Sequence, residues 1–160
     1  MRLLKHLLTP HWLALRAFPP ATLRQIESAI KASERQHDGE LRFAVEASLP
    51  FGFLNLSTRK RAEALFAQLG VWDTEHNSGV LVYVQLVDRR IEIVADRGIS
   101  AHVAQAEWNA ICRAMESEFK RKDFLKGALQ AIGAITELLA KHFPPRGRNP
   151  NELPDKPVVV

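Results

Sequence analysis

Four side chains with metal-binding oxygens flank one segment of this 160-residue chain. Asp73, Glu75 and Asn77 precede an apolar run, and Asp96 follows the next strand-like segment. Carboxylate and amide oxygens are the ligands that Ca²⁺ and Mg²⁺ prefer in proteins. The alternative is a solvated loop in which Arg97 pairs with a carboxylate.

Other chemistry has weaker support in the sequence. Asp88 and Arg89 form a second polar group, a further binding candidate that is also typical of a plain hairpin turn. His76 and His102 fall beside the acidic segment, but no nucleophile–histidine–carboxylate arrangement follows from their spacing. Cys112 lies in an apolar helical stripe, so we expect a buried and inert thiol. The catalytic residues, if any exist, are unknown at this point.

A β-hairpin must position these groups. Residues 80–86 are almost wholly apolar and rich in β-branched types, as in a strand covered on both faces. Residues 90–95 alternate and then turn apolar, and the short connection 87–89 favours antiparallel pairing. The acidic group therefore lies at one end of the hairpin, and Asp88 and Arg89 lie at the other.

The rest of the chain predicts an α/β fold. Residues 41–47 alternate with a period of two, which indicates another strand, and helical spacing covers 21–36, 57–69, 103–120 and 124–139. A helix between the first two strands implies a right-handed parallel crossover. We expect a three-layer α/β/α sandwich with a small mixed sheet. Residues 19–143 form this domain, after an N-terminal helical arm (1–18) and before a proline-rich tail (144–160), extended or disordered.

The arm, residues 2–15, is amphipathic and basic, with leucines on one face and a tryptophan near its end. This pattern is found in helices that lie on a membrane surface, and more often in helices packed on their own domain or on a second copy. The loop at 49–56 adds Phe51 and Phe53, which we expect to be exposed. Contact with a protein partner, self-association and peripheral membrane contact are all open.

Composition sets broad limits. The net charge of +4, the 46% of hydrophobic residues and the 25% of charged residues describe an ordinary globular protein. Zinc spacings, glycine–aromatic RNA-binding signatures and long basic runs are absent from the sequence, so no nucleic-acid partner is expected. A single cysteine excludes an intrachain disulfide, and no apolar segment reaches the length of a membrane span. We expect a cytoplasmic protein, with membrane-peripheral contact left open.

Several segments together resemble the TPM domain family. The hairpin entry and exit are similar to that family's hallmark, and the preceding helix and turn and the late aromatic–glycine pattern fall in the expected order. The resemblance runs over residues 20–143 and rests on Asn77-Ser78-Gly79-Val80-Leu81-Val82, Asp88-Arg89-Arg90-Ile91-Glu92-Ile93, Ala64-Leu65-Phe66, Leu69-Gly70-Val71-Trp72, and Phe119, Lys122-Asp123-Phe124 and Gly127.

The resemblance implies an α/β/α sandwich. It also implies varied activities, since some members of the family are acid phosphatases, some bind divalent metal, and others act in photosystem repair or with membrane receptors. Two segments depart from the family pattern: Arg16-Ala17-Phe18-Pro19 stands where an acidic Val-Asn-Asp-like segment is common, and Asp96-Arg97-Gly98 replaces Gly-Tyr-Gly.

Two functions follow as hypotheses. The first is a non-catalytic binding or assembly module, peripheral to a membrane or a protein complex. The second is a divalent-metal-dependent phosphatase-like hydrolase that uses Asp73, Glu75, Asn77 and Asp96 as ligands for Ca²⁺ or Mg²⁺.

Overall fold

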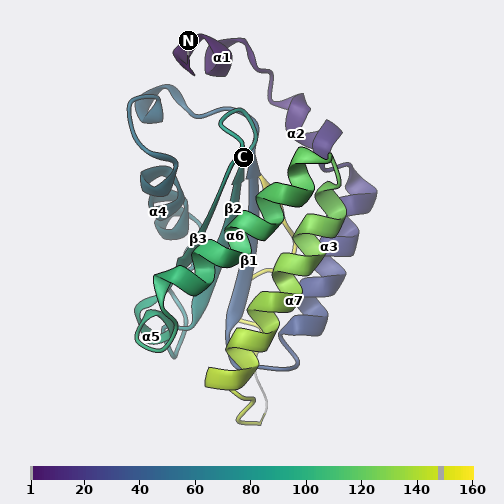
Figure 1. The fold of residues 1–160 in the computed structure, drawn as a ribbon. Helices are drawn as coiled ribbons and strands as arrows, with labels where there is room; N and C mark the ends of the chain where they lie inside the picture. Colours follow the sequence, from purple (N-terminus) through teal and green to yellow (C-terminus); the bar gives the residue numbers. More distant parts are fainter. Residues whose placement is uncertain (1, 148–149) are drawn as a thin grey trace.

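A four-stranded mixed sheet in the order β3-β2-β1-β4 forms the centre of the molecule (Figure 1). The computed structural model describes residues 2–147 and 150–160. β1 runs parallel to β2 and β4, and β2 and β3 form the antiparallel hairpin. This arrangement confirms the α/β fold, the parallel crossover and the antiparallel edge. The strands are β1 (Glu40–Glu46), β2 (Gly79–Gln85), β3 (Arg90–Ala95) and β4 (Val158–Val159).

The two faces of the sheet pack on different helices, because alternate residues of a strand point to opposite sides. Val80, Val82 and Val84 face one core, which is closed by α3 (Pro20–Ser33), α6 (Gln105–Lys120) and α7 (Phe124–His142). Leu81 and Tyr83 face the other core, which is closed by α4 (Thr58–Gln68) and the C-terminal tail. Figure 1 shows these layers, and β2 is buried along its whole length as the apolar run predicts.

The C-terminal tail contributes to the sheet, which the sequence pattern did not predict. Val158 and Val159 pair with Ala44 and Val45 on the outer edge of β1. Leu153 is buried in the second core. The described part of the tail therefore lies extended over the domain, and the sheet has one strand more than the three that were expected.

Helix ends and tight contacts follow the local sequence. Ser57 accepts a hydrogen bond from the backbone N–H of Lys60 and caps α4, as its position before the helix predicts. Gly127 lies where a Cβ atom would come within 2.8 Å of the Phe119 ring, so close helix packing explains this glycine. Gly133 has open space around it, so packing does not explain it.

A chain of hydrogen bonds lies buried between α3 and α7. His37 Nδ1 accepts from the Gly39 N–H at 3.1 Å, so the neutral ring carries its proton on Nε2 and donates to Ser33 Oγ at 2.8 Å. Ser33 is 2.6 Å from Thr136 Oγ1, which donates to the backbone oxygen of Ile132. Burial lowers the pKa of His37 to about 4. The network is satisfied with a neutral imidazole, and a second proton on the ring would break it.

The N-terminal arm consists of two short helices, α1 (Arg2–Leu8) and α2 (Trp12–Ala17), at the end of the sheet where β1 and β2 finish (Figure 1). Ala14 and Phe18 are buried in the first core and anchor α2. No helix in the described parts of the chain is long and apolar enough to cross a bilayer.

Candidate functional site

The structure brings part of the predicted acidic group together. Asp96 precedes the short helix α5 (Arg97–Ser100), and its Oδ1 accepts from the Arg97 N–H at 2.6 Å. The Arg97 guanidinium donates to Asn77 Oδ1 at 3.1 Å, and the backbone oxygen of Asn77 accepts from the Gly98 N–H. Asn77, Asp96 and Arg97 are thus assembled at the predicted end of the hairpin, as supports of the β3–α5 turn.

Two glycines make this turn possible. A Cβ atom on Gly98 would lie 2.6 Å from the backbone oxygen of Asn77, and one on Gly79 would lie 2.0 Å from that of Val71. The loop between α4 and β2 therefore lies directly against the strand ends. This close approach explains Gly79, which belongs to the family resemblance, and Gly98, the one residue of Asp96-Arg97-Gly98 that keeps the family's Gly-Tyr-Gly pattern.

Asp73 and Glu75 are exposed on that same loop. The Glu75 backbone N–H donates to Glu152 of the tail at 2.9 Å. Across residues 2–147 and 150–160, no three His, Cys, Asp or Glu side chains are grouped so that they could hold a metal ion. Asp96 Oδ2 is nevertheless buried and has no hydrogen-bond partner among the described residues. The four-ligand site stays a prediction, with Asp96 as its best-placed member.

The opposite end of the hairpin holds a histidine–carboxylate pair that the sequence pattern did not predict. His6 of α1 is buried, and its Nδ1 accepts from the Leu49 N–H at 2.9 Å. The proton is therefore on Nε2, which donates to Asp88 Oδ1 at 3.1 Å. His6 looked like part of the polar face of an amphipathic helix. In the structure, His6 connects the arm to the hairpin through its hydrogen bond to Asp88.

Asp88 also lines a depression of about 280 Å³ between the hairpin turn and the start of α4. The other lining residues are Ser57, Thr58 and Arg90. Arg89 is exposed at the turn with a φ of 53°, a left-handed conformation that suits a tight hairpin. This end of the hairpin is polar and accessible, but its carboxylate is already bound to His6.

A buried ionic network lies under α4. Arg61 binds both carboxylate oxygens of Glu46, with distances of 3.0 Å from Nε and 2.6 Å from Nη2, and Tyr83 donates to the same carboxylate at 2.6 Å. The Phe53 ring covers the guanidinium at 4.7 Å, so Phe53 is half-buried rather than exposed as expected. Burial lowers the pKa of Arg61, but the hydrogen bond and charge of Glu46 raise it overall.

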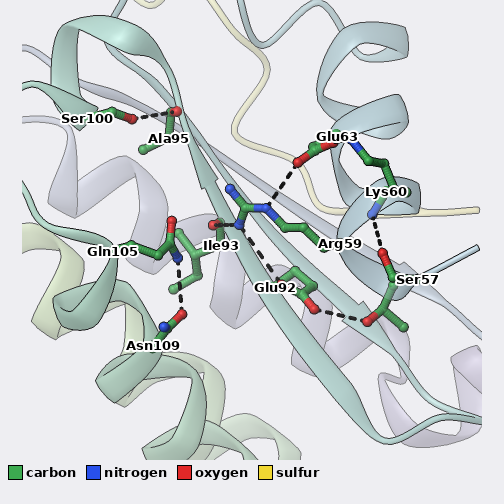
Figure 2. Close-up of polar contacts among 11 residues, drawn as sticks. Ser57, Arg59, Lys60, Glu63, Glu92, Ile93, Ala95, Ser100, Gln105 and Asn109 are labelled. Atoms are coloured by element: carbon green, nitrogen blue, oxygen red, sulfur yellow. Dashed lines mark hydrogen bonds and ion pairs between the residues drawn. The ribbon is translucent and has the colours of Figure 1, made fainter.

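Figure 2 shows how side chains cover the outer edge of β3. Arg59 of α4 donates to the backbone oxygen of Ile93 at 2.6 Å, and Ser100 donates to that of Ala95 at 3.0 Å. Thr58 binds Glu92 of the same strand at 2.9 Å. Side chains that bind edge carbonyls hinder pairing with another sheet, so this polar group protects an edge.

The candidate nucleophile Cys112 and the candidate acid–base residues His76 and His102 lie in different surroundings. Cys112 is buried, and burial raises the pKa of its thiol to about 12, so the prediction of a buried thiol is confirmed. His102 is exposed and stacks near His142 with ring centres 6.3 Å apart. His76 is exposed on the α4–β2 loop.

The arm exposes several large apolar side chains to solvent. We call the exposed side chains of its two helices the arm surface, namely Leu4, Leu7, Leu8, Trp12 and Leu15. Leu8 is 73% exposed, while His6 on the opposite side of α1 is 3% exposed. Phe51 is also exposed, in the 3₁₀ turn η1 (Phe51–Phe53) that follows Leu49, the contact of His6.

The fold and the sites define an α/β/α domain whose polar groups are mostly engaged in holding strand ends, turns and edges. The sequence model of the TPM domain matches residues 16–138, so the chain belongs to the TPM domain family. The comparison with curated proteins gives no match.

Two solved structures resemble this chain. BA42 protein from the psychrophilic bacterium Bizionia argentinensis is 28% identical with a TM-score of 0.77, over 86% of this chain and 92% of that one. The N-terminal domain of a P. gingivalis protein is 14% identical with a TM-score of 0.65, over 88% of this chain and 95% of that domain. The second likeness concerns the fold alone.

Proposed function

We propose that this TPM domain is a non-catalytic binding module that docks on an anionic membrane surface through its arm surface. One observation carries the proposal: α1 turns His6 into the domain and Leu4, Leu7 and Leu8 toward solvent. A helix that covers a core normally does the reverse. Because His6 is fixed by Leu49 and Asp88, α1 cannot rotate to bury Leu4 and Leu8 without losing both hydrogen bonds.

The charge of the arm favours an anionic occupant. Residues 1–26 contain Arg2, Lys5, Arg16 and Arg24 and no Asp or Glu. Basic residues beside leucines and a tryptophan are typical of helices that lie in the interface of an anionic bilayer. Each basic residue near such a surface contributes about 1 kcal/mol, and burying each leucine adds about 1.5–3 kcal/mol.

A second copy of the chain fits this surface less well. In a two-fold dimer each arm would face an identical arm, and the basic residues would lie near one another without acidic partners. A membrane of mixed neutral and anionic lipids offers an apolar interior for the exposed leucines and tryptophan of the arm and negatively charged headgroups for its basic residues.

Flotation with vesicles tests this function. We expect the full chain to float to the top fraction with vesicles of phosphatidylcholine and phosphatidylglycerol. With vesicles of phosphatidylcholine alone, we expect it to remain in the bottom fraction. Leu8→Ser removes about 1.5 kcal/mol of burial and lowers binding about tenfold. Leu129→Ser is the matched control, because Leu129 is also exposed but lies on α7, away from the arm.

Two results would contradict the proposal. Absence of flotation at low salt with a monomer in light scattering would remove the docking function. A dimer that Leu8→Ser dissociates, without vesicle binding, would make the arm surface a self-association site instead.

A second candidate function has one specific observation in its favour. Asp96 Oδ2 is buried, has no hydrogen-bond partner within residues 2–147 and 150–160, and belongs to the predicted metal site of a phosphatase-like hydrolase. Calorimetric titration with Ca²⁺ and Mg²⁺ tests this candidate. Millimolar binding that Asp96→Asn abolishes would favour the hydrolase, and binding that survives Asp96→Ala combined with Asp73→Ala would contradict this site.

A further inference from the structure

The outer edge of β1 holds the C-terminal tail as a binding protein holds an extended peptide. Arg42 on β1 donates to the backbone oxygens of Pro154 and Lys156. Glu40, two residues earlier on the same strand, accepts from the Leu153 N–H at 3.0 Å. Further along, β4 pairs with β1 as a parallel strand. These bonds go to the backbone of the tail, so they depend little on its sequence and suit other extended segments as well.

The tail inserts one large apolar side chain into the domain. Leu153 is 7% exposed and lies in the second core, with Ala44 of β1 and Leu65 of α4. Exposed and buried residues alternate over 152–157, as in a strand that lies on a surface. We call the outer edge of β1 together with the apolar contacts of Leu153 the tail seat. Its selectivity rests on one apolar side chain and on strand pairing.

The tail leaves two buried polar atoms of this seat unsatisfied. Glu40 Oε1 and Arg42 Nε have no hydrogen-bond partner within residues 2–147 and 150–160, although these side chains are 0% and 5% exposed. A buried polar atom without a partner costs free energy, which hydration restores when the tail leaves. The cost weakens the hold of the tail. A segment that offers a donor to Glu40 and an acceptor to Arg42 therefore fits the seat better.

Asp155 occupies the place from which such a side chain can act. It is buried and lies between the two residues whose carbonyl groups bind Arg42. Its Oδ1 accepts from Asn151 of the tail itself at 2.9 Å. An ionised carboxylate can only accept hydrogen bonds, whereas a side-chain amide both donates and accepts. An asparagine at this place therefore suits the two unsatisfied atoms better than an aspartate.

We propose that the tail seat binds an extended segment of a partner protein, which replaces the tail and adds to the outer edge of β1 as a parallel strand. The segment carries a leucine at the place of Leu153, an asparagine at that of Asp155, and β-branched residues at those of Val158 and Val159. Strand addition to a sheet edge is a frequent mode of peptide recognition. This interaction is independent of the docking proposed for the arm.

A synthetic peptide with the sequence of residues 150–160 is the probe, because it matches the occupant seen in the structure. A tethered tail competes at an effective concentration of about 1 mM, so the full chain carries Leu153→Ser to weaken its own tail. Fluorescence anisotropy of the labelled peptide should show saturable binding. The peptide with Leu153→Ser should bind about tenfold more weakly, and the peptide with Asp155→Asn should bind more tightly than the unchanged one.

Further variants separate backbone contacts from side-chain contacts. Glu152→Ala with Lys156→Ala in the peptide should leave its affinity within about threefold, because both side chains are exposed. Arg42→Met in the chain should weaken binding about tenfold or more, because two hydrogen bonds from a charged donor are lost. Arg113→Met is the matched control, since Arg113 is exposed on α6, which covers the other face of the sheet.

Cross-linking tests the same seat without Leu153→Ser in the chain, in case that variant does not fold. Ala44 is the register partner of Val158 and is fully buried. In the full chain with Ala44→Cys, a peptide with Val158→Cys should form a disulfide, and the same peptide with Leu153→Ser should not. No binding up to about 1 mM peptide together with no disulfide, or equal behaviour of the Leu153→Ser peptides, would overturn the proposal.

Discussion

Replacing Arg61 by methionine should strongly destabilise the domain. The side chains of Arg61 and Glu46 are 8% and 2% exposed, so the substitution leaves a carboxylate buried with Tyr83 as its remaining hydrogen-bond partner in this network. Breaking a buried ion pair from one side costs about 3–5 kcal/mol. Loss of the stacked Phe53 adds to this cost, since a cation over an aromatic ring contributes about 0.5–2 kcal/mol.

The double variant separates the buried charge from the lost packing. In Glu46→Gln with Arg61→Met, the amide oxygen can still accept from Tyr83 and no unpaired charge is buried. We therefore expect the double variant to be more stable than Arg61→Met alone, with a coupling energy of about 2 kcal/mol.

Urea denaturation at pH 7 gives these free energies of unfolding. Lys60→Met is the control on the same helix, because Lys60 is 65% exposed and pairs with Glu63 at the surface. It should change stability by less than about 0.5 kcal/mol. A cost below 1 kcal/mol for Arg61→Met, or strict additivity in the double variant, would refute the assignment of this network as a structural anchor.

Further predictions concern histidine and glycine. The pKa of His37 falls from 6.5 to about 4 on folding, so the unfolded chain binds more protons between these values and stability is lost as pH falls through that window. The loss reaches about 3 kcal/mol at 1.36 kcal/mol per pH unit. The stability difference between the native chain and His37→Gln, measured by urea denaturation, should therefore change by about 3 kcal/mol against the native chain from pH 7 to pH 4. Gly79→Ala should destabilise the domain because its Cβ would lie 2.0 Å from Val71, whereas Gly133→Ala in open space should stabilise α7 by about 0.5–1 kcal/mol, both read from thermal unfolding. A stabilised Gly79→Ala, or a stability difference between the native chain and His37→Gln that does not change with pH, would contradict these contacts.

The hairpin and its layers were predictable because their signals are local. Residues 80–86 show continuous apolar character, and turn residues on both sides mark where the strand begins and ends. Helices on both faces follow from such a strand, and the structure confirms them. The end of the hairpin where Asn77 and Asp96 meet also followed from strand direction alone.

The contacts that were missed join residues far apart in the chain. Val158 and Val159 follow five proline residues in the last 17 positions and show no strand period, yet they pair with Ala44 and Val45. Glu46 ends a strand and Arg61 lies in the first turn of a helix, and in both places these residue types are ordinarily found at the surface. Nothing in their spacing reveals a shared buried site, so tertiary packing alone creates it.

The depth at which the arm lies in a lipid bilayer is the most direct test of docking through the arm surface. A nitroxide placed at Leu8→Cys can be attached selectively, because Cys112 is buried with a thiol pKa raised to about 12. On anionic vesicles the label at position 8 should become accessible to oxygen and shielded from a water-soluble nickel complex, while one at Leu129→Cys stays in water. Equal exposure of both labels to the nickel complex in the presence of anionic vesicles would contradict docking through the arm surface.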